Sequence, residues 1–237
     1  NYQPLTPLSF LERASDVFPD HIAIIHGNTK TTYREFYTRS KQLAFSLAQL
    51  GMTRGSTVST LLLNTPPMLE VHYGIPMCGA VIHAINTRLD PATIAFQLDH
   101  AKSEILFYDR ELGSIVKEVL SHCQVKPHLI EFVDSEYEYK DAPVDLGADD
   151  YELFLNKGDS NYQWLMPENE WDAISVGYTS GTTGDPKGVV SHHRGAYLLA
   201  QGNAIVASMP KHSVYLWTLP MFHCNGWCFP WTMSANI

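Results

Sequence analysis

Hydrophobic residues recur at the spacing of helices or of strands along most of the chain. Apolar positions three and four apart predict an amphipathic helix over residues 7–18, which Pro19 ends. Short apolar runs then alternate with helical patterns. Strands are expected at 22–25, 30–33, 58–63, 81–85, 105–108 and 128–133, and helices from Thr32 to Gly51 and at 66–79, 91–100 and 112–120. Repeated strand–helix units predict an α/β fold with mostly parallel sheets and helices on both faces.

Capping residues mark two of the expected helix starts. Thr32 lies three residues before Glu35, which is the spacing of a capping box. Asp90 and Pro91 have the residue types of an N-cap and a first helical turn. In the last third of the chain, strands are expected at 173–178, 188–191 and 214–218, a helix at 194–208 and the start of another at 229.

The composition is that of a globular protein, with 45% hydrophobic and 17% charged residues. No apolar run approaches the roughly 20 residues of a membrane span. The start, Asn1-Tyr-Gln-Pro, is neither basic nor apolar enough for a signal peptide. We therefore expect a cytoplasmic protein without a membrane span, with its four cysteines as reduced thiols.

Most of the formal net charge of −9 comes from one stretch, residues 134–152, which has eight acidic residues and one lysine. Dense like charge repels and resists packing, so this stretch is predicted to be a solvated surface loop. The rest of the chain is nearly neutral and has no basic stripe. A nucleic acid is therefore not an expected partner.

The eleven residues from Tyr178 to Gly188 have the composition of a phosphate-binding loop. Glycine allows positive φ and a close approach of backbone N–H groups to an anion. Hydroxyl groups and one lysine add further donors and a positive charge. The residues with these properties are Thr179, Ser180, Gly181, Thr182, Thr183, Gly184, Lys187 and Gly188.

Two other interpretations of this run are weaker. A flexible linker would not be expected between two strand-like segments, 173–178 and 188–191. The common ATP-binding P-loop requires glycine before its lysine and Ser or Thr after it, whereas Pro186 and Gly188 flank Lys187. A phosphate site of this kind can serve kinases, hydrolases or nucleotidyl transferases.

The run TSGTTGDPKGVV resembles the phosphate loop of the AMP-forming acyl-CoA synthetases, within the adenylate-forming superfamily. Asn86-Thr-Arg-Leu-Asp90 and Pro220-Met-Phe-His-Cys-Asn-Gly-Trp227 resemble two further segments of that family, in the same order. The first residues and the segment after Pro220 look closest to the medium-chain and 3-methylmercaptopropionyl-CoA ligase branch. The resemblance implies an incomplete N-terminal AMP-binding domain. Residues 1–170 would form a first α/β subdomain, and 171–237 the phosphate loop and the start of a second.

The resemblance also implies roles for individual residues. Thr179 would bind Mg²⁺, and Lys187 and His223 would be catalytic. The ATP phosphates would be bound by Thr179, Ser180, Gly181, Thr182, Thr183, Gly184 and Lys187, and the carboxylate substrate by His223, Asn225, Gly226 and Trp227. Without the resemblance, His223 and Trp227 would be interpreted as ordinary core residues. A zinc site at His223, Cys224 and Cys228 is disfavoured by the aromatic neighbours and the absence of a second ligand pair.

The reaction implied is activation of a small or medium-chain carboxylate by ATP to an acyl-adenylate, followed by transfer of the acyl group to coenzyme A. Alternatives are a long-chain fatty-acid ligase, an inactive nucleotide-binding module and an ATPase that releases orthophosphate. A homodimer is a candidate assembly of the full-length enzyme. The family's Mg²⁺-binding glutamate, ribose-binding aspartate, hinge and C-terminal domain have no match here, so we expect the isolated chain to be inactive in acyl-CoA formation.

Overall fold

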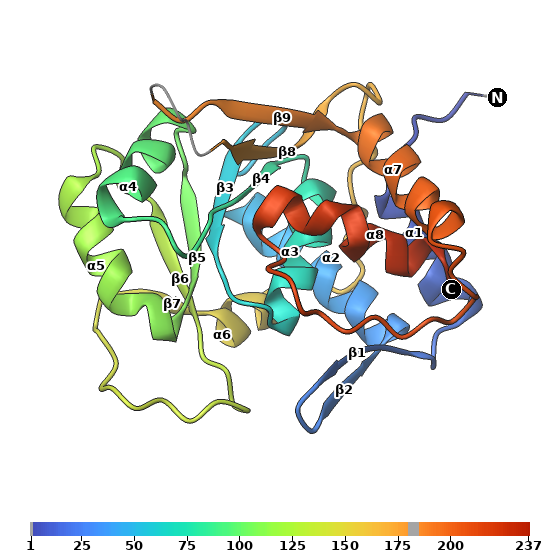
Figure 1. The fold of residues 1–237 in the computed structure, drawn as a ribbon, viewed down its shortest axis with the longest axis horizontal. Coiled ribbons are helices and arrows are strands. Elements are labelled where there is room, and N and C mark those ends of the chain that lie inside the picture. The colour runs from blue at the N-terminus through green and yellow to red at the C-terminus, as the bar shows by residue number, and fades with distance from the viewer. Residues whose placement is uncertain (1, 180–184) are drawn as a thin grey trace.

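The computed structural model describes residues 2–179 and 185–237, and only the backbone of residues 224 and 225 (Figure 1). The helices are α1 (Leu8–Val17), α2 (Tyr33–Gln49), α3 (Pro66–Met77), α4 (Pro91–His100), η1 (Arg110–Leu112), α5 (Gly113–His122), α6 (Tyr151–Asn156), α7 (His193–Val206), η2 (His223–Cys228) and α8 (Phe229–Ala235). The strands are β1 (Ile22–His26), β2 (Thr29–Thr32), β3 (Thr57–Leu61), β4 (Val81–Ala84), β5 (Ile105–Asp109), β6 (His128–Phe132), β7 (Asp149–Asp150), β8 (Ala173–Tyr178) and β9 (Gly188–His192).

One sheet contains strands in the order β7-β6-β5-β3-β4-β8-β9. Its neighbouring strands are parallel, except that β8 and β9 are antiparallel. Strands β1 and β2 form a separate antiparallel hairpin that projects away from the sheet (Figure 1). The carboxyl ends of β3, β4, β5, β6 and β8 therefore lie at the same edge of the sheet, where α/β proteins usually bind ligands.

Helices cover both faces of this sheet, with α4 and α5 on one side and α2 and α3 on the other (Figure 1). Strand β5 shows how the sequence produces the two layers. Ile105 and Phe107 belong to the core under α2 and α3, whereas Leu106 and Tyr108 belong to the core under α4 and α5. A strand buried on both faces needs a continuous apolar run, which β5 has. The predicted α/β fold class is confirmed.

Both predicted capping residues occupy the predicted positions. The Glu35 backbone N–H donates to Thr32 Oγ1 (3.3 Å), and the Thr32 backbone N–H donates to Glu35 Oε2 (2.7 Å). The Thr93 backbone N–H donates to Asp90 Oδ1 (2.9 Å) at the start of α4. These side chains satisfy N–H groups that have no partner inside the helix, so they fix where α2 and α4 begin.

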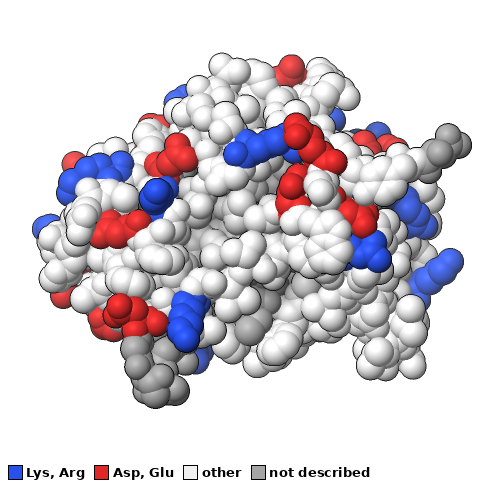
Figure 2. All heavy atoms as spheres, turned by 90° about the horizontal axis from the view of Figure 1, so that it is seen from above, with Lys and Arg blue, Asp and Glu red and all other residues white. Residues whose placement is uncertain are grey.

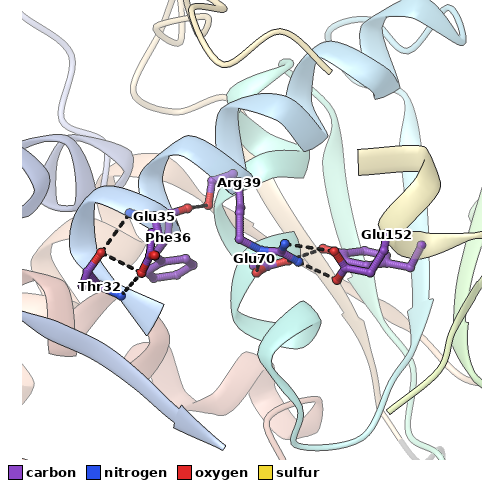
Figure 3. A network of polar contacts seen from close by, with 8 residues as sticks. Thr32, Glu35, Phe36, Arg39, Glu70 and Glu152 are labelled. Atoms are coloured by element: carbon purple, nitrogen blue, oxygen red, sulfur yellow. Dashed lines mark hydrogen bonds and ion pairs between the residues drawn. The ribbon is translucent and has the colours of Figure 1, made fainter. Parts of the chain in front are cut away.

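A buried carboxylate joins three helices (Figure 3). Glu70 of α3 is 1% exposed and accepts hydrogen bonds from Arg39 of α2 (Nε to Oε1, 2.5 Å) and from the hydroxyl of Tyr151 (2.6 Å). Arg39 also pairs with Glu152 of α6 (2.7 Å). The buried charge is thereby both paired and hydrogen-bonded, as its removal from water requires.

The prediction that residues 134–152 form a solvated loop is wrong at both ends of the stretch. Asp134 is buried and contacts His26 Nε2 at 2.8 Å. The last residues form β7 and the first turn of α6, because Tyr151, Phe154 and Leu155 form an apolar helix face that packs into the core. Between these ends, most side chains are exposed, as predicted.

The strand predicted at 214–218 is also wrong. This segment has no regular secondary structure, and Val214 and Leu216 are 90% and 80% exposed. A strand requires a neighbouring strand for its N–H and C=O groups, and none pairs with this segment among the described residues. With β1 and α8, the segment lines a cavity of about 410 Å³.

None of the described helices combines the length and the apolar character of a transmembrane segment.

Candidate functional site

The two arms of the predicted phosphate loop lie at the carboxyl edge of the parallel strands. Strand β8 is parallel to β4 and ends at Tyr178, which pairs with Gly188, the first residue of β9. Beyond this pair, the Thr179 N–H donates to the Lys187 carbonyl (3.1 Å). The arms are therefore held together by backbone hydrogen bonds. The other predicted phosphate-binding residues, at 180–184, lie outside the described residues.

The side chains of Thr179 and Lys187 are both exposed. In the described part of the chain, no carboxylate forms an ion pair with Lys187. Figure 2 shows the side of the molecule on which β8 and β9 lie; Lys and Arg are interspersed with Asp and Glu there, around a broad uncharged area. Lys187 is thus exposed and without an ion pair in the described part of the chain, and the side of the molecule shown in Figure 2 has no broad basic surface.

The segment 220–227, predicted to contact the carboxylate substrate, is attached to the same edge by Asn64, which follows β3. The Asn64 side-chain amide donates to the Leu219 carbonyl (2.8 Å), and its Oδ1 accepts from the Met221 N–H (2.9 Å). Sequence analysis did not single out Asn64. The available signal was a polar amide directly after a buried strand, at the edge where parallel strands place ligand-binding residues.

Helix α8 holds the other end of this segment. Trp231 is 1% exposed, and its Nε1 donates to the His72 carbonyl (3.1 Å). The Tyr73 hydroxyl donates to the Pro230 carbonyl (3.2 Å). Both of these hydrogen bonds between α3 and α8 are buried. They hold α8 against α3, and η2 directly precedes α8, so the position of η2 is fixed relative to the sheet.

Between these attachments, η2 contacts β8. His223 is exposed and Trp227 is 56% exposed, so neither is a core residue. Gly226, Trp227 and Cys228 have positive φ values of 57°, 53° and 63°. Left-handed backbone is strained for Trp and Cys, and such strain is frequent at functional sites. The Asn203 side-chain amide of α7 donates to the Trp227 carbonyl (2.8 Å) and supports this turn.

The structure thus places Thr179, Lys187, His223, Gly226 and Trp227 on adjoining segments. The roles assigned to them, including that of Thr179 toward Mg²⁺ and of Asn225 toward a substrate, remain predictions.

The described side chains do not form a metal centre by themselves. Within residues 2–179 and 185–237, no three His, Cys, Asp or Glu side chains are grouped as metal ligands. Cys78, Cys123 and Cys228 are free cysteines. Burial raises the pKa of the Cys228 thiol to about 12, so this residue is protonated at neutral pH.

Comparison with known proteins identifies the family. A family model described as AMP-binding enzyme matches residues 11–236. The chain belongs to the AMP-binding enzyme family.

Named members of this family are similar to the chain over its whole length. A peroxisomal acetate/butyrate–CoA ligase of Arabidopsis thaliana is 46% identical over 99% of the chain and 43% of its own length. A peroxisomal butyrate–CoA ligase of the same plant is 46% identical over 100% of the chain and 42% of its own length. The chain therefore spans less than half the length of these AMP-binding enzymes.

A solved structure has the same fold. The crystal structure of the anthranilate CoA ligase AuaEII in complex with anthranoyl-AMP superposes on all of this chain with a TM-score of 0.82, at 21% identity, and 45% of that ligase is covered. At this identity the likeness concerns the fold alone.

Proposed function

We propose that this AMP-binding chain is the part of an acyl-CoA ligase that binds the phosphates of ATP and the carboxylate of the acid. In the whole enzyme, the carboxylate attacks the α-phosphorus of ATP and displaces pyrophosphate, which gives an acyl-adenylate. The thiol of coenzyme A then displaces AMP, which gives the thioester. The observation that carries the proposal is the adjacency of the loop arms and η2, with Lys187 and His223 both exposed.

The arrangement suits the charge changes of the first step. Negative charge accumulates on the departing pyrophosphate, and fixed backbone N–H groups with a lysine can stabilise it without a protein nucleophile. Lys187 supplies the positive charge of that lysine at one arm of the loop. His223, on η2, would contact the carboxylate that attacks.

The proposal assigns one described residue, Thr179, to Mg²⁺. Thr179 offers a hydroxyl oxygen on one arm of the loop and Asp185 a carboxylate on the other, and both residues are exposed. Mg²⁺ is usually held by one or two protein carboxylates together with substrate phosphates and water, so the Thr179 hydroxyl would supply one ligand beside them. When bound, the ion would neutralise charge on the phosphates.

A small or medium-chain aliphatic acid is the proposed substrate. The support is the names of the two relatives that are 46% identical, one for acetate and butyrate and one for butyrate. A long-chain fatty acid is the alternative.

ATP–pyrophosphate exchange tests the proposal. The assay would use this chain and a form extended to the length of its relatives, with acids from acetate to palmitate. We expect the extended form to exchange label only when a carboxylate is present, with the highest rate for a short or medium chain. Exchange with palmitate alone would reassign the substrate. Binding of ATP without exchange for any acid would favour a nucleotide-binding module.

Location and assembly are separate proposals. The cytoplasm was expected from the sequence, whereas both Arabidopsis relatives are named peroxisomal, so fractionation of the source cells must separate the two compartments. A homodimer of the extended form is the proposed assembly, and sedimentation of that form would test it.

A further inference from the structure

Tyr178, the last residue of β8, contacts residues that are far from it in the sequence. Its hydroxyl lies 2.7 Å from Nδ1 of His100. Its ring centroid lies 5.0 Å from that of His83 on the neighbouring strand β4. Its Cζ lies 3.6 Å from the point that a Cβ at Gly188 would occupy, which is ordinary contact distance. The ring is thus bounded by α4, β4 and the start of β9.

The two histidines that contact Tyr178 have different surroundings. His83 is fully buried, and its Nδ1 lies 2.8 Å from Ser59 Oγ on β3. Burial lowers the pKa of His83 to about 4, so its ring is neutral at neutral pH. His100 is the last residue of α4, and its ring stacks on that of Phe96 with 5.7 Å between centroids. Tyr178 therefore meets a buried ring on β4 and an exposed ring at the end of α4.

The position of Tyr178 controls both arms of the phosphate loop. Tyr178 and Gly188 form the last pair of the β8–β9 ladder, and the Thr179 N–H bonds to the Lys187 carbonyl immediately beyond it. A shift of Tyr178 would therefore move Thr179 and Lys187 together. The link to His100 is the side-chain hydrogen bond that ties this ladder end to α4.

We propose that Tyr178 and His100 are a positioning pair that fixes the arms of the phosphate loop against α4. The pair acts through Thr179 and Lys187 and does not touch the reacting atoms. The ligand assigned to the arms rests on the proposed function, whereas the anchoring itself does not.

Four substitutions separate positioning from general stability. Tyr178→Phe removes the hydroxyl and keeps the ring. His100→Ala removes the partner, and His100→Asn restores a polar atom near the position of Nδ1. Tyr108→Phe is the matched control. The Tyr108 hydroxyl, on β5, donates to Glu131 of β6 (3.3 Å), and β3 and β4 separate this pair from β8. Thermal unfolding of each variant would identify any general loss of stability.

Limited trypsin digestion reports on the arms directly. Lys187 is exposed and is followed by Gly188, so cleavage after it gives fragments that mass spectrometry identifies. We expect Tyr178→Phe and His100→Ala to raise the initial cleavage rate at this bond about fivefold, the effect of about one hydrogen bond on local opening. His100→Asn and Tyr108→Phe should cleave at the wild-type rate.

ATP affinity, measured by calorimetry with MgCl₂ present, completes the test on the same 237-residue proteins. Tyr178→Phe and His100→Ala should weaken binding about fivefold, and His100→Asn should restore it. Unchanged cleavage in both variants would overturn the proposal. Faster cleavage with unchanged ATP affinity would support the anchoring and overturn its consequence for ATP binding. If the wild-type chain does not bind ATP, the proposed function fails for this chain, and the cleavage rates alone decide whether the pair anchors the arms.

Discussion

Lys187 carries the one positive charge of the proposed phosphate contact that the structure describes. Its side chain is exposed and has no ion pair in the described part of the chain, so it contributes little to folding. Lys187→Ala should therefore lower ATP–pyrophosphate exchange in the extended form by about a hundredfold and leave thermal stability unchanged. Lys157→Ala removes an exposed lysine after α6 and is the control. Unchanged exchange in Lys187→Ala would remove this residue from the mechanism.

Asp109, at the end of β5, is a buried acid whose ionised form is disfavoured by its surroundings. It is 2% exposed, and its Oδ2 has no hydrogen-bond partner among the described residues. Burial, with added repulsion from Asp134 and other nearby acids, raises the pKa of Asp109 to about 6 from 3.8. A raised pKa means that the folded state favours the protonated form. Stability associated with Asp109 is therefore full below about pH 4 and is lost as the pH rises through about 6.

Asp109→Asn should remove this loss. Asn keeps the Oδ1 that accepts from the Glu111 N–H (3.3 Å). At pH 8 we expect the variant to be more stable than wild type by about 2 kcal/mol, and at pH 4 equally stable. Thermal or urea unfolding across this pH range would measure it. Asp141→Asn changes the net charge equally at an exposed site of the acidic stretch and should show no such trend. A variant less stable than wild type at pH 8 would contradict the assigned cause.

Individual site residues were predictable from the sequence where they belong to a recognisable motif. Thr179, Lys187, His223, Gly226 and Trp227 were all named from the sequence, and the structure places them on adjoining segments. Asn64 was missed because its role comes from a fold contact with residues 219–221, far away in the sequence. The sequence marks Asn64 only as a polar residue after a buried strand and does not encode its contact with residues 219–221.

The pairing of α2 and α3 depends on one glycine. A Cβ added at Gly74 would lie 2.6 Å from Leu43 Cδ2 and 2.9 Å from Leu43 Cβ, so rotation of the Leu43 side chain cannot relieve the contact. Gly74→Ala should destabilise the protein by about 1–3 kcal/mol, even though Ala favours a helix.

The control for this prediction is Gly202, which lies inside α7 and has no atom within 4 Å of an added Cβ. Gly202→Ala should stabilise the protein by up to about 1 kcal/mol. Chemical unfolding of both variants measures the two signs. A Gly74→Ala protein as stable as wild type would show that α2 and α3 can separate at little cost.

Elements were predictable where local signals and packing agree. The capping residues Thr32 and Asp90 fixed two helix starts correctly because a cap acts within its own first turn. Helix α6 was missed because acidic neighbours dominate the stretch, although Tyr151, Phe154 and Leu155 have helical spacing. The strand expected at 214–218 failed for the opposite reason. Its pattern is apolar and β-branched, but a strand is completed by a partner that the described residues do not supply.

Several highly exposed apolar side chains lie in the last third of the chain. Ile205 and Val206 end α7, and Val214, Leu216 and Leu219 follow in the irregular segment; each is at least 60% exposed. Large apolar patches on a protein surface usually mark an interaction site. The chain also spans only 43% of the length of a relative that is 46% identical to it. Both observations lead to the same expectation, that acyl-CoA formation needs more polypeptide than these 237 residues.

We therefore predict that the 237-residue chain alone forms no measurable acyl-CoA from butyrate, ATP and coenzyme A, whereas the extended form does. The physical reason is that the family's Mg²⁺-binding glutamate and ribose-binding aspartate have no match in this sequence, so we expect that the α-phosphorus would not be held in line with the carboxylate. Thioester formation can be followed by mass spectrometry. ATP binding by the short chain serves as the control that it is folded. Robust thioester formation by the short chain would show that the residues described here, together with the loop at 180–184, already hold both substrates in reactive geometry.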